Sequence, residues 1–235
     1  MNPDLPPLAP AQVLAVGRNY AEHAAELGHE APKAPLLFWK PIGSLVQGRC
    51  PLPRWPEGPT RIDYEGEIAL VLDRHLGPGT PPLPDDPWRV VRAVAAAVDV
   101  SDRDLQKLEP QWVRAKGFHG ACAVGEQAPR PADPEALRLD TWKNDVHVQS
   151  GRTAQLLFPF RDLLVYMHGF LRLFAGDVIL TGTPAGVGPV APGDRLRVVV
   201  GQDAPGAPLA SLEVTFEEGP AVPPFRRGAS GAPGL

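Results

Sequence analysis

The sequence predicts a β-rich α+β fold, and two observations carry that prediction. Thirty prolines and 24 glycines interrupt the apolar segments of this 235-residue chain without forming a repeat, and most of those segments are too short for helices. Such punctuation is typical of many short strands joined by ordered loops. Hydrophobic residues make up 43% of the chain, which allows a substantial core. Residues 219–235 are rich in proline and glycine with little to pack, so we expect a mobile tail there.

Composition excludes several classes of protein. The net charge is −4 and no run of lysine or arginine occurs, so nucleic-acid binding is disfavoured. Cys50 and Cys122 lie far apart with no Cys-x-x-Cys motif, which argues against a disulfide framework or a structural zinc site. The first residues lack a secretion signal, and no stretch of 18 apolar residues occurs. We therefore expect a cytoplasmic protein that does not associate with membranes.

The first elements are a short strand at residues 12–16 and a helix of about two turns that stops near Gly28. His23 and Glu26 are three residues apart on this helix and so project from one face. A carboxylate in that position can orient an imidazole as a general base. The alternative is that both residues belong to an ordinary polar helix surface.

Residues 63–72 read as a strand that begins acidic and ends apolar. Because side chains alternate across a strand, Asp63, Glu65 and Glu67 fall on one face. Three carboxylates held this close repel one another unless water, a proton or a cation separates them. Oxygen ligands suit Mg²⁺, Mn²⁺ or Ca²⁺. The pattern predicts a metal site, with a solvated acidic strand edge as the alternative.

A second apolar run, residues 93–98, stops at Asp99. A carboxylate at the mouth of a buried strand needs a partner, so Asp99 is a candidate third ligand. Ser101 and Asp104 resemble a capping box that opens a helix directly afterwards. Lys116 follows in a segment that returns toward the sheet; taken alone, such a lysine more often lies on the surface.

The second half continues in strands. Two strand-like pieces within residues 139–148 are joined by residues 143–145, whose Asn and Asp favour a tight hairpin turn. Apolar residues at helical spacing predict a core helix after Pro159 that includes Phe170. Residues 177–180 form a buried strand that runs into a Gly/Thr loop, whose amides could bind an anion such as a substrate carboxylate. Residues 195–200 and 210–216 complete the predicted strands.

Taken together, these stretches resemble the fumarylacetoacetate hydrolase family from residue 16 to about residue 216. The motifs that carry the resemblance are Gly17-Arg-Asn-Tyr-Ala-Glu-His23, Phe38-Trp-Lys-Pro41, Tyr64-Glu-Gly-Glu67, Val98-Asp-Val-Ser-Asp-Arg-Asp-Leu-Gln106, Ala115-Lys-Gly117 and Leu180-Thr-Gly-Thr-Pro-Ala-Gly-Val-Gly188. The resemblance implies a mixed β-sandwich roll of the C-terminal domain type. It also implies one catalytic domain over residues 1–218 and a homodimer.

The resemblance assigns roles to individual residues. It implies that Glu65, Glu67 and Asp99 hold Mg²⁺ or Mn²⁺, with Ca²⁺ able to take the site in crystals. Asp63 stands where many relatives have histidine, so it is not assigned as a ligand. The catalytic positions of the family match His23, Glu26 and Lys116. Its substrate-binding positions match Gln106 and Thr183, and Arg18 is a further candidate substrate contact.

The activity implied is that of a divalent-metal-dependent enzyme acting on small 2-oxo acids. It would hydrolyse the C–C bond of acylpyruvates, or decarboxylate oxaloacetate-type substrates, through a metal-stabilised enolate. An alternative is a 2-hydroxyhepta-2,4-diene-1,7-dioate isomerase or a 5-oxopent-3-ene-1,2,5-tricarboxylate decarboxylase of aromatic catabolism. A third interpretation is a β-rich domain that binds a metal and a dicarboxylate without turnover.

Overall fold

The computed structural model describes residues 9–26, 28, 30–203 and 206–224. In that part of the chain the helices are α1 (Ala21–Glu26), α2 (Arg103–Leu108), α3 (Val113–Gly117) and α4 (Phe160–His168). The strands are β1 (Val13–Gly17), β2 (Leu36–Lys40), β3 (Leu45–Val46), β4 (Arg49–Arg54), β5 (Ile62–Leu72), β6 (Val91–Asp102), β7 (Cys122–Val124), β8 (Ala128–Pro129), β9 (Leu137–Lys143), β10 (Val146–Arg152), β11 (Val178–Leu180), β12 (Gly188–Pro189), β13 (Arg195–Gln202) and β14 (Ala210–Ala221). The predominance of strands confirms the predicted fold class.

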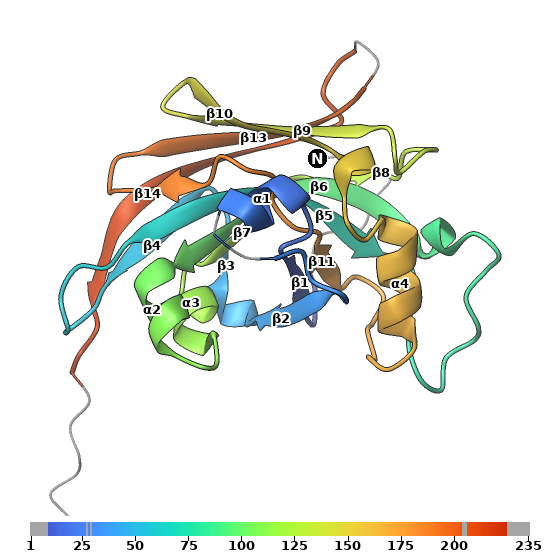
Figure 1. Cartoon of the computed structure of the whole chain (residues 1–235), viewed down its shortest axis with the longest axis horizontal. Helices are drawn as coiled ribbons and strands as arrows, with labels where there is room; N and C mark the ends of the chain where they lie inside the picture. The colour runs from blue at the N-terminus through green and yellow to red at the C-terminus, as the bar shows by residue number, and fades with distance from the viewer. Residues whose placement is uncertain (1–8, 27, 29, 204–205, 225–235) are drawn as a thin grey trace, which may run out of the picture.

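Within the described residues the strands form two mixed sheets. The larger sheet has the order β2-β1-β11-β5-β6-β7-β3, with β12 added on β5 and β8 on β6. The smaller sheet has the order β10-β9-β13-β14-β4. Figure 1 shows the smaller sheet lying across the curved β5–β6 pair, with α2 and α3 at one end and α4 at the other. Strands β5 and β6 are therefore the centre of the roll.

Two cores lie on the two faces of the larger sheet. The core between the sheets includes Ile68 and Leu70 from β5 together with Val198 and Val214 from the smaller sheet. The opposite face carries small residues, among them Ala69 of β5 and the alanines at 93, 95 and 97 of β6. Because both faces are covered, every residue of β5 is buried. Any charge on β5 must therefore be compensated inside the protein.

Several predicted elements are confirmed and two need correction. The hairpin turn is confirmed: Asn144 and Asp145 have φ of 48° and 66° between β9 and β10. The predicted Ser101 cap is wrong, because β6 continues to Asp102 and the side chain of Asp102 accepts the hydrogen bond from Leu105 N. The predicted core helix ends at His168, which leaves Phe170 52% exposed.

Near the carboxyl end, β14 runs to Ala221, which is inside the segment predicted as a tail. The rest of that segment, from residue 225, lies outside the described residues. No helix in the described part of the chain is long and apolar enough to cross a membrane.

Candidate metal and 2-oxo acid site

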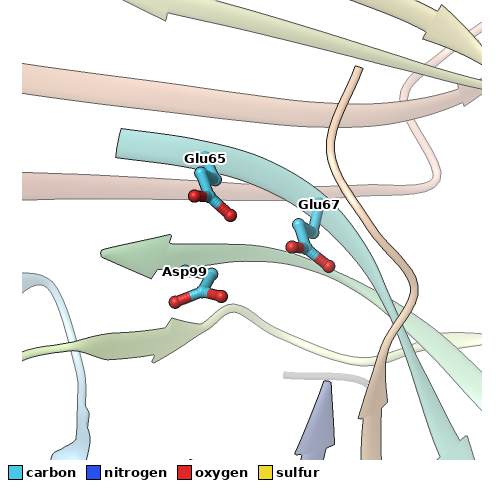
Figure 2. Close-up of side chains that lie close together, drawn as sticks. All are labelled: Glu65, Glu67 and Asp99. Atoms are coloured by element: carbon cyan, nitrogen blue, oxygen red, sulfur yellow. The ribbon is translucent and has the colours of Figure 1, made fainter. Parts of the chain in front are cut away.

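The carboxylates of Glu65, Glu67 and Asp99 converge because β5 and β6 pair antiparallel with Glu65 directly opposite Asp99. Glu67 lies two residues along β5 and therefore projects from the same face as Glu65. One oxygen from each residue lies within 4.8 Å of the other two. Figure 2 shows all three carboxylates directed into the same space. We call these three residues the carboxylate triad; all three are buried.

Two lysines neutralise Asp99. Lys40 Nζ donates to Asp99 Oδ1 at 2.6 Å, and Lys116 Nζ donates to Asp99 Oδ2 at 2.7 Å. Lys116 also donates to both oxygens of Glu65, at 3.1 and 3.0 Å. Burial alone would lower the pKa of Lys116, but the carboxylates of Asp99 and Glu65 outweigh it and raise that pKa. Lys116 is therefore a buried ammonium group in contact with the triad. It is not the surface lysine that its segment, taken alone, would suggest.

Glu65 has further partners. Ser101 Oγ donates to Glu65 Oε1 at 2.7 Å, and Arg103 Nη2 forms an ion pair with the same oxygen at 2.7 Å. Burial raises the pKa of Glu65, but the positive charges of Lys116 and Arg103 more than offset it, so the net shift is downward. Glu65 is therefore held as a carboxylate.

Glu67 differs from the other two members of the triad. Among the described residues, Glu67 accepts a hydrogen bond from Gly182 N at Oε2, at 2.6 Å, and forms no salt bridge. Burial, followed by repulsion from Asp99 and Glu65, raises the pKa of Glu67 well above its ordinary value. A buried carboxylate in this position requires a proton or a cation. The convergent oxygens and the uncompensated charge of Glu67 fit a hard divalent cation such as Mg²⁺ or Mn²⁺.

His23 and Glu26, predicted as a general base and its orienting carboxylate, lie beside this triad. His23 is 3% exposed, and its Nδ1 is 3.4 Å from Glu26 Oε2. Burial lowers the pKa of His23, against the opposing effects of Glu65 and Glu26. The imidazole is therefore neutral near pH 7. With Nδ1 facing a carboxylate and carrying the proton, Nε2 is the acceptor available for a reacting group.

A cavity of about 210 Å³ lies beside His23 and Glu65. It is lined by His23 and Glu65 and by four basic side chains, those of Arg18, Arg103, Lys107 and Lys116. Gln106 also lines it, and its Oε1 accepts from Arg103 Nη1 at 3.0 Å. The cavity is therefore suited to an anion.

Thr183 is buried in the loop after β11 and is not among the residues lining that cavity. Its Oγ1 accepts a hydrogen bond from Gln149 Nε2 at 2.8 Å. Two amides of this loop, expected to bind a substrate carboxylate, instead donate to carboxylates of the protein: Gly182 N to Glu67, and Gly186 N to Glu26 at 3.2 Å. These two amides are therefore not freely presented, and anion binding by the loop stays a prediction.

Sequence reasoning did not identify Gln149, and it left Lys40 and Arg103 without roles. Lys40 ends a hydrophobic strand before a proline, a pattern that fits a surface residue equally well.

Asp63 could not be placed from sequence. Its carboxylate accepts from Arg61 Nε at 2.8 Å and from Arg103 Nε at 3.0 Å. It is satisfied by arginines and lies outside the triad.

Fold and site together define a β-rich α+β protein with a buried, oxygen-rich centre that could hold a metal ion. Residues 12–216 match the family described as fumarylacetoacetate (FAA) hydrolase C-terminal. The chain belongs to the fumarylacetoacetate hydrolase family.

Relatives with named activities are enzymes. Oxaloacetate tautomerase YcgM of Escherichia coli (strain K12) is 34% identical over 195 residues, covering 80% of this chain and 87% of that protein. The mitochondrial oxaloacetate decarboxylase of Dictyostelium discoideum is 34% identical over 193 residues, covering 79% of this chain and 87% of that protein. The crystal structure of 2-hydroxyhepta-2,4-diene-1,7-dioate isomerase from Mycobacterium marinum superposes with a TM-score of 0.75 at 29% identity, covering 90% of this chain and 76% of that one.

Proposed function

We propose that this protein is a divalent-metal-dependent enzyme that acts on 2-oxo acids by C–C bond hydrolysis, decarboxylation or the related proton transfer. The observation that carries the proposal is the uncompensated carboxylate of Glu67 in a buried triad that adjoins a basic cavity. A divalent cation held by Glu65, Glu67 and Asp99 would polarise the 2-oxo group and stabilise the enolate charge that develops when a bond to C3 breaks. Such stabilisation is worth several kcal/mol.

The side chains of the protein supply the remaining requirements. Lys116 places a second positive charge beside the triad, where negative charge develops on the substrate oxygen. Arg18 and Arg103 line the cavity and can bind a carboxylate of the substrate. Gln106, held by Arg103 through its Oε1, keeps its amide donors available.

His23 is the base of the proposed mechanism. Its Nε2 would remove a proton from water that attacks the distal carbonyl of an acylpyruvate, while Glu26 stabilises the imidazolium that results. The same nitrogen can move a proton to or from C3 of a keto–enol pair. Helix α1, which carries both residues, is fixed to the loop after β11 by the hydrogen bonds from Gly186 N to Glu26. This contact fixes the position of the helix that carries the base.

Two of the four basic side chains of the cavity, Arg103 and Lys116, are paired with Glu65, and the other two, Arg18 and Lys107, favour substrates with two carboxylates. Oxaloacetate has two, whereas acetylpyruvate has one, so we place oxaloacetate-type substrates first. The same observation supports the second candidate function, isomerisation or decarboxylation of hydroxyheptadienedioate-like diacids.

A panel of 2-oxo acids assayed with Mg²⁺ and with a chelator tests the proposal. Oxaloacetate, acetylpyruvate and 2-hydroxyhepta-2,4-diene-1,7-dioate would be compared, following decarboxylation, tautomerisation, hydrolysis and isomerisation separately. We expect turnover of at least one diacid that disappears on chelation. Turnover that survives complete chelation would reject the metal site. Binding of these acids without turnover would identify the non-enzymatic metal- and dicarboxylate-binding domain instead.

A further inference from the structure

The geometry points to Gln149 as a positioning residue that holds the substrate loop, residues 181–187, against β5 and leaves the Thr183 hydroxyl proton for a ligand bound at the triad. This role rests on the proposed function and adds one contact to it: Thr183 follows Gly182, whose amide donates to the triad member Glu67, and would meet a 2-oxo acid bound there. Gln149 lies on β10 of the smaller sheet and is 2% exposed. It reaches across the interface between the two sheets.

The need for such a residue comes from a gap in the larger sheet. On one edge of β5, strand β11 pairs with Ala69 to Val71, and β12 pairs with Asp63 and Tyr64. The substrate loop spans the interval between them, where Glu65 and Glu67 are located. Gly66 N, in the middle of that interval, donates to Gln149 Oε1 at 2.9 Å. A side chain from the other sheet thus takes the place of a missing strand partner.

The other end of the same amide binds the substrate loop. Gln149 Nε2 donates to Thr183 Oγ1 at 2.8 Å and to Pro184 O at 2.9 Å. The orientation of the amide is fixed by its partners, because a backbone N–H only donates and a carbonyl only accepts. Thr183 Oγ1 must therefore be an acceptor toward Gln149. The proton of the Thr183 hydroxyl is left for another acceptor, as binding of an anionic substrate requires.

Close packing around Gly66 supports the same role. A Cβ atom at Gly66 would lie 2.2 Å from Thr141 Oγ1 and 3.0 Å from Gln149 Oε1. Only glycine allows the smaller sheet to approach this closely. The approach occurs between the two metal-ligand positions of β5. Gln149 thus sets the distance from the backbone of Glu65 and Glu67 to the loop that carries Gly182 and Thr183.

Direct binding of oxalate, a planar dianion that cannot turn over, tests this role in the full chain with Mg²⁺. Calorimetry would compare Gln149→Met, Thr183→Val and the double variant. We expect each single substitution to raise the oxalate Kd roughly tenfold, since Thr183→Val removes the hydroxyl that would bind the charged ligand and Gln149→Met removes the contact that orients this hydroxyl. The double variant should be within about twofold of Thr183→Val, because Gln149 acts through Thr183.

Thr141→Val is the matched control. Thr141 lies opposite Gln149 in the β9–β10 pair and is fully buried beside Gly66, and its hydroxyl has no hydrogen-bond partner among the described residues. Its oxalate Kd should equal that of the wild type. Gln149→Glu covers the case in which the Met variant does not fold. It keeps the length of the side chain but accepts the Thr183 proton, so it should also weaken oxalate binding.

The outcomes separate this role from the proposed function. If wild-type protein with Mg²⁺ does not bind oxalate, the 2-oxo acid function itself fails, and the role of Gln149 fails with it. If the wild type binds but the effects of Gln149→Met and Thr183→Val are additive, only the positioning role is overturned. An effect of Thr141→Val as large as that of Gln149→Met would overturn it too, since general loosening of the interface would then explain both.

Discussion

Asp63 and Glu67 are two carboxylates on the same face of β5, each 1% exposed, yet their surroundings are opposite. Asp63 receives three hydrogen bonds from two arginines, Arg61 and Arg103. From the described part of the chain Glu67 receives one, from the backbone amide of Gly182. The first carboxylate is fully compensated by the protein, and the second is not.

The comparison shows that burial of a carboxylate does not by itself indicate a metal site. An acid paired with two guanidinium groups is stable as an anion and has no need of a further cation. An acid next to two other carboxylates, with no cationic partner of its own, takes up a proton or a metal ion. The functional part of β5 is therefore the part that the protein leaves incompletely neutralised.

The largest expected effect comes from Glu67→Gln. Removing this carboxylate takes away a proposed metal ligand, so Mg²⁺-dependent turnover should fall by about 10³-fold or more, corresponding to several kcal/mol of lost charge stabilisation. Steady-state rates on oxaloacetate across a Mg²⁺ titration measure this. Asp63→Asn is the matched control, and its rate should still depend on Mg²⁺. If the two variants lose activity equally, the distinction between the two carboxylates is wrong.

His23→Ala should have the next largest effect, and the effect should depend on the reaction. Acetylpyruvate hydrolysis needs a base for the attacking water and should fall by about 10²–10⁴-fold. Oxaloacetate decarboxylation needs no attacking water and should fall less. Both rates are measured on the same preparation with saturating Mg²⁺. Equal losses in the two reactions would show that His23 does not activate water.

Thermal denaturation with and without Mg²⁺ separates the two carboxylates by stability. Asp63→Asn breaks a buried ion pair and should cost about 2–4 kcal/mol of unfolding free energy. At ~2–4 °C per kcal/mol, the melting temperature should fall by several degrees. Mg²⁺ at about a hundred times its Kd should add about 2.7 kcal/mol to the wild type and to Asp63→Asn. It should add nothing to Glu67→Gln. A Mg²⁺-induced shift that persists in Glu67→Gln would place the cation elsewhere.

The members of the triad were predictable from sequence because a local signal marks each of them. Alternation along β5 places Glu65 and Glu67 on one face, and the end of an apolar run marks Asp99. Antiparallel pairing then sets Glu65 opposite Asp99. The same local logic predicted the hairpin turn at Asn144, where residue type and backbone angle are directly related.

What the sequence could not predict depends on contacts between distant segments. Gln149 reaches Gly66 across 83 residues of sequence and from another sheet, and no periodicity marks it. Asp63 resembles a third ligand in the alternating pattern, and only the approach of Arg103 shows otherwise. The Ser101 cap was wrong because pairing with β5 extends β6 past Asp99, which leaves Ser101 Oγ to donate to Glu65. Tertiary pairing overrode a local capping signal.

The smallest expected effect is a change in the pH dependence of Glu26→Gln. The hydrogen bond and the charge of Glu26 raise the pKa of His23, while burial lowers it below its usual 6.5. Activity that needs the neutral imidazole is lost as the pH falls through the pKa of His23, so the acidic limb of the wild-type profile should lie below pH 6.5. Removing the charge of Glu26 lowers that pKa further and moves the acidic limb to lower pH.

The hydrogen bond from His23 to Glu26 is long, at 3.4 Å, so the rate of Glu26→Gln at neutral pH should fall only about fivefold, or ~1 kcal/mol. Glu22→Gln is the control, because Glu22 is an exposed acid on the same short helix and is not among the groups that shift the pKa of His23. Its profile should coincide with that of the wild type. An acidic limb that moves to higher pH in Glu26→Gln would mean that the titrating group is not His23. The incompletely neutralised triad would then act without the base assigned to it here.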